Sequence, residues 1–142
     1  SEFTLVNKFF NLHNISVETV AHTDIENLSV LPTVDENGNH TVMLTYASVN
    51  FDKELPALKT TLEIDGVKGK KDITIWAIDE NHTNPYAVFT KKGYAPELTA
   101  EQIAELRDEG NLKPVKQYSC EADGKLTIDV ELSNNGLMVI EF

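Results

Sequence analysis

The fold is decided by Asp35-Glu-Asn-Gly-Asn39 and by the segment that follows, His40-Thr-Val-Met-Leu-Thr-Tyr-Ala-Ser-Val49. An alternation runs through Val42, Leu44 and Tyr46. A period of two places alternate side chains on one face of a strand. The Asn-Gly pair before the segment supplies the positive backbone angles that a hairpin turn needs. We therefore predict a strand over residues 40–49 that begins at a tight turn, and we prefer this turn to a calcium loop, because the spacing lacks the glycine and glutamate of an EF-hand.

Further strand candidates lie on both sides of this segment. They are short runs rich in apolar or β-branched residues: Ile15–Ala21, Leu28–Val34, Leu58–Ile64, Asp72–Ile78, Lys125–Leu132 and Leu137–Phe142. We expect turns between strands at Asp65-Gly66, Asp123-Gly124 and Asn134-Asn135-Gly136, the last as a tight hairpin. Short strands with turns at this spacing predict a mostly β fold, an antiparallel sandwich.

One part of the chain breaks the strand pattern and predicts one or two short helices. Residues 85–92 begin with a proline, which suits the first turn of a helix. Thr99-Ala-Glu-Gln102 is a capping box, and Gly110 is placed to end the helix that follows. Ile103 and Leu106 fall on one face, so we expect this helix to lie against the sheet or a neighbour.

Composition bounds the class of protein. A chain of 142 residues with 41% hydrophobic content is the size of one domain, so we expect residues 1–142 to form a single domain. The net charge of -11 argues against a nucleic-acid partner and against an anionic membrane surface. No run approaches the roughly 20 apolar residues of a membrane span.

The start of the chain has two features of its own. It begins at Ser1 rather than at Met, which we interpret as an internal start. The first dozen residues are apolar for an exposed terminus, and we expect them to pack on something, which in an excised domain is absent. Their apolar members are Leu5, Val6, Phe9, Phe10 and Leu12.

The chain offers no complete set of catalytic residues or metal ligands. The carboxylates gather in turns and on the helix over residues 100–110, where solvation explains them. The single cysteine, Cys120, has no His nearby, so we expect a buried structural thiol. The four histidines lack the spacing of a zinc pair. We therefore expect no catalytic residue, metal site or cofactor in this chain.

Aromatic rings are the remaining candidates for a binding function. Trp76, Tyr86, Phe89 and Tyr94 lie near one another in the sequence, and Tyr118 lies further along. Exposed rings can stack on the apolar faces of sugars, whereas large rings also dominate core burial. The first four are our candidate carbohydrate-binding residues, with burial in the core as the alternative.

A resemblance to a known family rests on a run of segments. These are Ile73-Thr-Ile-Trp-Ala-Ile-Asp-Glu-Asn-His-Thr-Asn-Pro-Tyr86, then Gly93, Leu98-Thr-Ala-Glu-Gln-Ile-Ala-Glu-Leu106 and Leu112-Lys-Pro114. Together they resemble the C-terminal region of β-xylosidases of glycoside hydrolase family 39. Asp79, His82 and Asn84 match polar positions of the family motif, and Gln102-Ile103 matches its helix start. Leu5-Val-Asn-Lys8 is similar to a family stretch at the end of the catalytic barrel.

The resemblance implies a β-sandwich attached to a (β/α)8 barrel that carries the catalytic glutamates. On this basis we expect a non-catalytic accessory domain that braces the catalytic barrel of the same parent chain. The alternative is a carbohydrate-binding module for xylan-type or other β-linked glycans. A third hypothesis, an independent hydrolase, predicts that the isolated chain turns over aryl glycosides, and we expect no such turnover.

Overall fold

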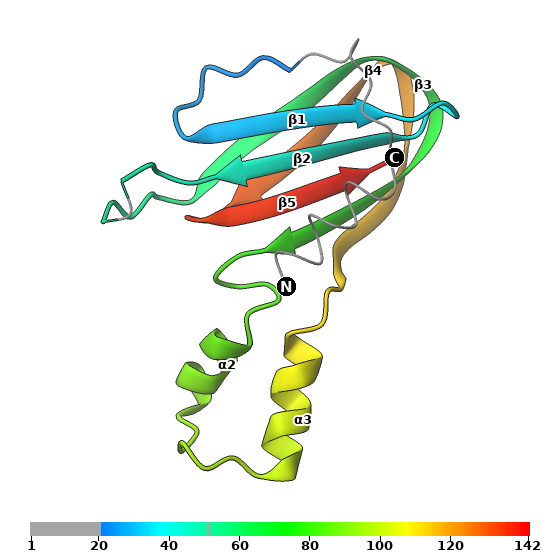
Figure 1. The fold of residues 1–142 in the computed structure, drawn as a ribbon. Coiled ribbons are helices and arrows are strands. Elements are labelled where there is room, and N and C mark those ends of the chain that lie inside the picture. Colours follow the sequence, from blue (N-terminus) through cyan, green and yellow to red (C-terminus); the bar gives the residue numbers. More distant parts are fainter. Residues whose placement is uncertain (1–20, 51) are drawn as a thin grey trace.

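The computed structural model describes residues 21–50 and 52–142, and it confirms the mostly β class with antiparallel strands. One sheet holds the strands in the order β1-β2-β5-β3-β4 (Figure 1). Their bounds are β1 Leu28–Val34, β2 His40–Tyr46, β3 Leu58–Ile78, β4 Pro114–Leu132 and β5 Gly136–Glu141. The strand predicted over residues 15–21, except its last residue, and the apolar residues 5–12 lie outside the described part.

The two layers of the molecule come from this one sheet. Strands β3 and β4 pair along almost their whole length, from Leu58↔Leu132 to Trp76↔Pro114. Figure 1 shows this long ribbon turning over so that one half passes behind β1, β2 and β5. The core lies between the layers and combines Val42 and Leu44 of β2 with Ile128 of β4.

The ribbon bends where turns between separate strands were predicted. Asp65-Gly66 and Asp123-Gly124 lie inside β3 and β4, and the pairing register shifts between Asp65 and Lys68. Gly66 has φ 81° and Gly124 has φ 89°, a left-handed backbone that residues with a Cβ adopt at a cost. The turn residues therefore make a bulge, which bends a strand without ending it. As strand boundaries, the two predictions were wrong.

The Asn134-Asn135-Gly136 turn connects the two layers instead of closing a hairpin. Strand β5 pairs with β2 and β3, so β4 and β5 are not hydrogen-bonded neighbours. Asn135 has φ 57°, and a Cβ on Gly136 would lie 2.7 Å from the Ser133 carbonyl oxygen. A tight turn is present here, but the predicted hairpin was wrong because the strand partners are set by distant residues.

The Asp35–Asn39 turn between β1 and β2 agrees with its prediction. The Asp35 carboxylate accepts hydrogen bonds from the backbone N–H groups of Asn37 and Asn39, at 2.8 and 2.9 Å. Its second oxygen accepts from the Asn39 side chain at 2.8 Å. Gly38 supplies φ 81°. The acidic side chain therefore organises the turn by satisfying its backbone donors.

Two helices form a hairpin inserted between β3 and β4: α2, Pro85–Lys92, and α3, Ala100–Glu109. Both were predicted. The capping box of α3 is present, because the Thr99 hydroxyl accepts from Gln102 N–H and the Gln102 side chain accepts from Thr99 N–H. Figure 1 shows the hairpin extending beyond the sheet, so α3 lies against α2. Among the described residues, no helix is long and apolar enough to cross a membrane.

Candidate functional site

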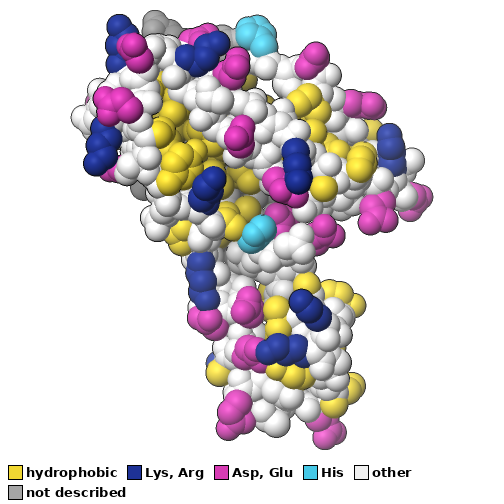
Figure 2. Space-filling model, turned by 180° about the vertical axis from the view of Figure 1, so that it is seen from behind, with side chains coloured by type: hydrophobic (Ala, Val, Ile, Leu, Met, Phe, Trp, Pro, Cys, Tyr) yellow, Lys and Arg dark blue, Asp and Glu magenta, His cyan; other side chains and the backbone are white. Residues whose placement is uncertain are grey.

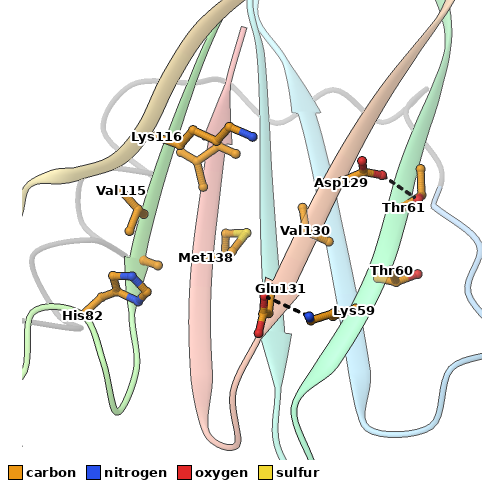
Figure 3. Close-up of a pocket in the computed structure, with 12 residues that line it drawn as sticks. Lys59, Thr60, Thr61, His82, Val115, Lys116, Asp129, Val130, Glu131 and Met138 are labelled. Atoms are coloured by element: carbon orange, nitrogen blue, oxygen red, sulfur yellow. Dashed lines mark hydrogen bonds and ion pairs between the residues drawn. The ribbon is translucent and has the colours of Figure 1, made fainter.

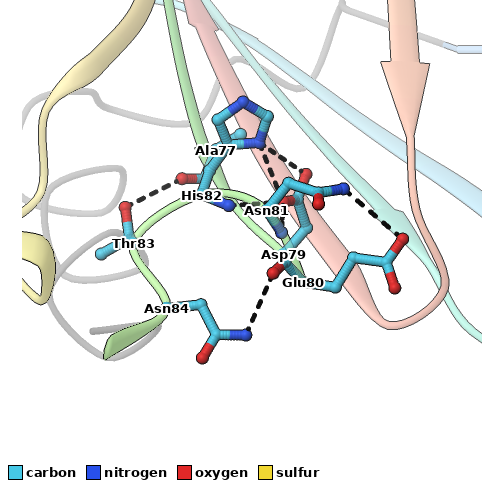
Figure 4. Close-up of polar contacts among 7 residues, drawn as sticks. All are labelled: Ala77, Asp79, Glu80, Asn81, His82, Thr83 and Asn84. Carbon is cyan, nitrogen blue, oxygen red and sulfur yellow. Dashed lines mark hydrogen bonds and ion pairs between the residues drawn. The ribbon is translucent and has the colours of Figure 1, made fainter. Parts of the chain in front are cut away.

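Asp79 organises the loop that leaves the sheet at the end of β3. Its carboxylate accepts from the backbone N–H groups of Asn81 and His82, each at 2.8 Å, and from the His82 ring nitrogen Nδ1 at 2.8 Å (Figure 4). The Asp79 side chain is only 6% exposed, whereas that of His82 is 45% exposed. A nearly buried carboxylate with three N–H donors is well satisfied, and it fixes both the loop and the imidazole.

Asn84 closes the same loop and starts the hairpin. Its side-chain oxygen accepts from Ala87 N–H at 3.1 Å, which makes Asn84 the N-cap of α2. Its amide donates to the Glu80 carbonyl at 3.3 Å, and the Thr83 hydroxyl donates to the Ala77 carbonyl at 3.2 Å. The three residues of the family motif are thus brought together, and in these contacts they shape a strand-to-helix connection.

The Asp79–His82 pair orients an imidazole but has no nucleophile beside it. In the part of the chain that the structure describes, His82 contacts neither a serine hydroxyl nor the Cys120 thiol. Nε2 points away from Asp79 (Figure 4). The described residues also contain no group of three or more His, Cys, Asp or Glu side chains that could hold a metal ion. The pair can therefore hold a ring nitrogen in place for hydrogen bonding.

The four candidate sugar-binding rings do not share one surface. Trp76 packs with Ile78 and Val139 on the sheet face opposite the main core. Tyr86 of α2 is 73% exposed. Phe89 and Tyr94 meet edge to face, with ring centroids 6.3 Å apart and planes at 80°. A coplanar exposed pair, which would favour glycan stacking, is not formed by these four rings.

Glu105 ties the end of α2 to α3. It accepts hydrogen bonds from the Lys92 ammonium and the Tyr94 hydroxyl. The hydrogen bond from Lys92, followed by that from Tyr94, lowers the pKa of the Glu105 carboxyl, and the same contact with Glu105 raises the pKa of Lys92. Lys113 and Asp108 form a second ion pair at 2.6 Å at the base of the hairpin. Charge pairs therefore fasten the hairpin internally.

An apolar groove runs along the hairpin. It has a volume of about 540 Å³ and is lined chiefly by Pro85, Leu98, Ile103 and Leu106. Neither helix has a fully buried residue, and Ile103 is 38% exposed. Figure 2 shows hydrophobic side chains at the surface of the hairpin as well as on the sheet. The sequence showed the apolar face of α3 but could not show that the sheet leaves it uncovered.

A second hollow lies between the two layers, close to where the hairpin departs. This cleft has a volume of about 610 Å³. Its inner side carries Ile75, Ala77, Val130 and Met138, and its mouth carries Val115, Lys116 and His82 (Figure 3). Sequence reasoning missed the cleft because it assigned no strand to residues 114–120. The only signal there was the alternation of Tyr118 and Cys120, both half-buried against the core.

Together these features define a small antiparallel β domain with an inserted helical hairpin and two apolar hollows. A family model described as glycosyl hydrolases family 39 matches residues 7–127. The chain belongs to that family. No curated protein sequence matches it.

Parts of three solved enzyme structures have a similar fold. A bacterial orthologue of human α-L-iduronidase is 23% identical, has a TM-score of 0.67, and is matched over 80% of this chain and 21% of its own. A monomeric β-xylosidase from Caulobacter crescentus CB15 is 14% identical, with a TM-score of 0.69, over 96% of this chain and 29% of its own. The family 39 enzyme of Xanthomonas axonopodis pv. citri is 16% identical, with a TM-score of 0.64, over 79% and 25%. This chain thus spans less than a third of those proteins.

Proposed function

We propose that residues 1–142 form a single non-catalytic accessory domain of a family 39 glycoside hydrolase, which braces the enzyme's catalytic barrel. The observation that carries this proposal is the helical hairpin. Helices α2 and α3 have 8 and 10 residues. Isolated helices shorter than about 12–15 residues are marginal in water, and most helical stability in proteins comes from packing. Two such helices that pack on each other and expose an apolar groove have the character of an interface.

The size of the chain relative to its relatives supports a partner within the same protein. It spans 21–29% of the lengths of the three similar solved structures. A surface on a larger domain of the same protein is therefore the partner we propose for the groove at Ile103 and Leu106. Apolar contact there would supply the packing that α3 lacks.

The carboxylates near the cleft support a non-catalytic role. A glycosidase places two carboxyl groups on opposite sides of a glycosidic bond, and the general acid is usually partly buried. Glu131 lies 4.0 Å from the Lys59 ammonium and its side chain is 61% exposed, while Asp129 accepts from the Thr61 hydroxyl at 2.9 Å. Both are exposed and already partnered, which favours a structural use on the outside of the ribbon.

The test is made in the full-length protein that contains the barrel. We expect Ile103→Asp to lower the melting temperature of the barrel, because it places a charge in the proposed interface. Glu101→Gln, in the same helix, is the matched control and should leave that temperature unchanged. Amide exchange at Gln102 and Leu106 in the 142-residue chain establishes that the variant hairpin still folds. An unaltered barrel melting temperature with a folded hairpin would refute bracing through α3.

Glycan binding is the second candidate, and the exposed ring of Tyr86 is the observation that favours it. A single exposed aromatic ring can stack on a pyranose. Affinity electrophoresis against xylan and other soluble β-linked glycans would show retention that Tyr86→Ala abolishes and Phe89→Leu changes less. Equal mobility in all gels removes this candidate. For the same chain we expect no release of aryl alcohol from aryl β-xylosides.

A further inference from the structure

The cleft between the two layers is a separate feature from the hairpin groove. Its volume of about 610 Å³ falls within the range of roughly 300–1,000 Å³ that is usual for small-molecule sites. Its walls come from both halves of the β3–β4 ribbon, with Ile75 and Ala77 on one side and Val130 on the other. Met138 adds a flexible thioether side chain that can adapt to an occupant.

Strand alternation decides which lining residues face the inside of the cleft. Thr60 pairs with Val130, and directly opposed residues share a face, so the Thr60 hydroxyl lies on the inner side. Lys59 and Glu131 form the adjacent pair, so this charged pair lies on the outer rim of the cleft.

Lys116 is the one charged side chain that the alternation places on the inner side of this cleft's described lining. It pairs with Ile75, whose side chain belongs to the core. Its ammonium lies 4.8 Å from the centre of the Tyr118 ring. Among the described residues it has no carboxylate within ion-pair distance, whereas Lys59 on the outer side of the same cleft has one. Lys116 and Met138 both line this cleft (Figure 3).

We propose that this cleft binds a small amphipathic carboxylate, a molecule with an apolar body and one anionic group. The apolar body would lie against Ile75, Val130 and Met138, which are only 5–6% exposed, so the ligand's own apolar area removed from water would drive binding. The carboxylate would accept from the exposed Lys116 ammonium at the mouth, in a charge-assisted hydrogen bond. Val115, which is 37% exposed beside Lys116, would be covered by the ligand.

The physical reason for a single anionic group is the balance of charge around the cleft. On the outer side, the charges of Lys59 and Glu131 offset each other. The Thr61 hydroxyl donates to Asp129 without neutralising it, so the outer rim keeps one negative charge, which disfavours a second anionic group on the ligand. A dianion would have only Lys116 as its partner inside and would meet the field of a chain with net charge -11. A neutral molecule would leave the ammonium with only the Tyr118 ring.

The experiment uses the 142-residue chain, labelled with ¹⁵N, and two matched series of probes. Straight-chain carboxylates from butanoate to octanoate are compared with the alcohols of the same length. We expect carboxylates to shift the amide signals of residues 59–61, 115–116, 130 and 138, with affinity rising with chain length. The corresponding alcohols should bind about tenfold more weakly, since they lack the charge that faces Lys116.

Two lysine variants separate binding from folding. Lys116→Met should weaken octanoate binding about tenfold and leave octanol binding unchanged, and Lys116→Arg should retain most of the preference. Lys91→Met, on α2 away from the cleft, is the control and should bind as the parent does. Equal affinities for carboxylate and alcohol, shifts confined to Tyr86, Phe89 and Tyr94, or preferential binding of neutral xylo-oligosaccharides at the cleft would each overturn the proposal. None of these results bears on whether α3 braces a barrel.

Discussion

The imidazole of His40 stacks face to face on the ring of Phe142, with centroids 4.9 Å apart and planes at 8°. The same two residues exchange backbone hydrogen bonds, at 2.7 Å and 3.0 Å. The stack therefore fastens the last residue of the chain to the first residue of β2. Burial, followed by the nearby Lys71 ammonium, lowers the pKa of His40 below its usual 6.5, although Asp35 acts in the opposite direction.

The lowered pKa of His40 predicts a stability that depends on pH. As pH falls, His40 takes up its proton at about pH 6.5 in the unfolded chain but only at a lower pH in the folded chain. The contribution of His40 to the free energy of unfolding therefore falls between about pH 6.5 and the folded pKa, and it is constant below the folded pKa. Urea unfolding between about pH 7.5 and pH 5 measures this. His40→Phe keeps an aromatic stack that cannot titrate, and it should flatten the slope. A slope identical to that of the parent would contradict the assignment.

Asp79→Ala should destabilise the domain by about 1–3 kcal/mol, because it leaves the N–H groups of Asn81 and His82 without their acceptor. Asp79→Asn should lower the free energy of unfolding by less than Asp79→Ala does, because an amide oxygen can still accept hydrogen bonds from the backbone. Urea unfolding followed by tryptophan fluorescence gives the difference. Glu80→Gln, in the same loop but exposed, is the control and should change stability by less than about 0.5 kcal/mol. Equal losses for the Ala and Glu80 variants would show that the loop does not depend on the carboxylate.

Gly136→Ala should cost about 1–3 kcal/mol, because its Cβ would meet the Ser133 carbonyl oxygen and the backbone has to shift. The matched control is Gly38→Asn, where φ is 81° but no atom lies within 4 Å of the position that a Cβ would occupy. Asparagine tolerates this left-handed backbone, so the control should lose less than about 1 kcal/mol. Thermal unfolding of both variants compares them, and a control that loses as much as Gly136→Ala would argue against the steric cause.

The Glu105 carboxyl should titrate below its usual pKa of 4.5, since its contacts with Lys92 and Tyr94 favour the charged form. The stability that it lends to the hairpin is present above that usual pKa and is lost as pH falls through the lowered one. Carboxyl carbon NMR signals of the labelled chain follow the titration. Lys92→Met should raise the midpoint more than Tyr94→Phe does, and Lys91→Met should not move it. A midpoint that ignores Lys92 would rule out this ion pair in solution.

Local signals in the sequence predicted the helices and several strand ends. The proline at its first turn predicted the start of α2, and the Thr99–Gln102 capping box sets the start of α3. Strand β1 has its predicted bounds for the same reason, because polar residues flank a short apolar run. Each of these features depends on residues within a few positions of one another.

Features that depend on distant partners were not predicted. The residues near Gly66 do not show that β3 stays paired with β4 on both sides of this glycine. A bulge in a long ribbon was therefore interpreted as a turn between two strands. Residues 114–120 were missed because Lys116 and Gln117 interrupt the apolar pattern of a strand that β3 nevertheless pairs with. At the candidate site, the grouping of Asp79, His82 and Asn84 followed from the family motif. The cleft did not, since its walls come from three strands that only the fold brings together.

The pairing of Trp76 with Pro114 makes the end of the β3–β4 ribbon an insertion site for additional sequence. The chain leaves β3 and returns to β4 at neighbouring points, so whatever lies between them closes on ends that the sheet already holds together. The entropic cost of a longer loop with fixed ends grows only slowly with its length. Segments of different length could therefore replace α2 and α3 without disturbing the sheet, which makes this junction suitable for grafting.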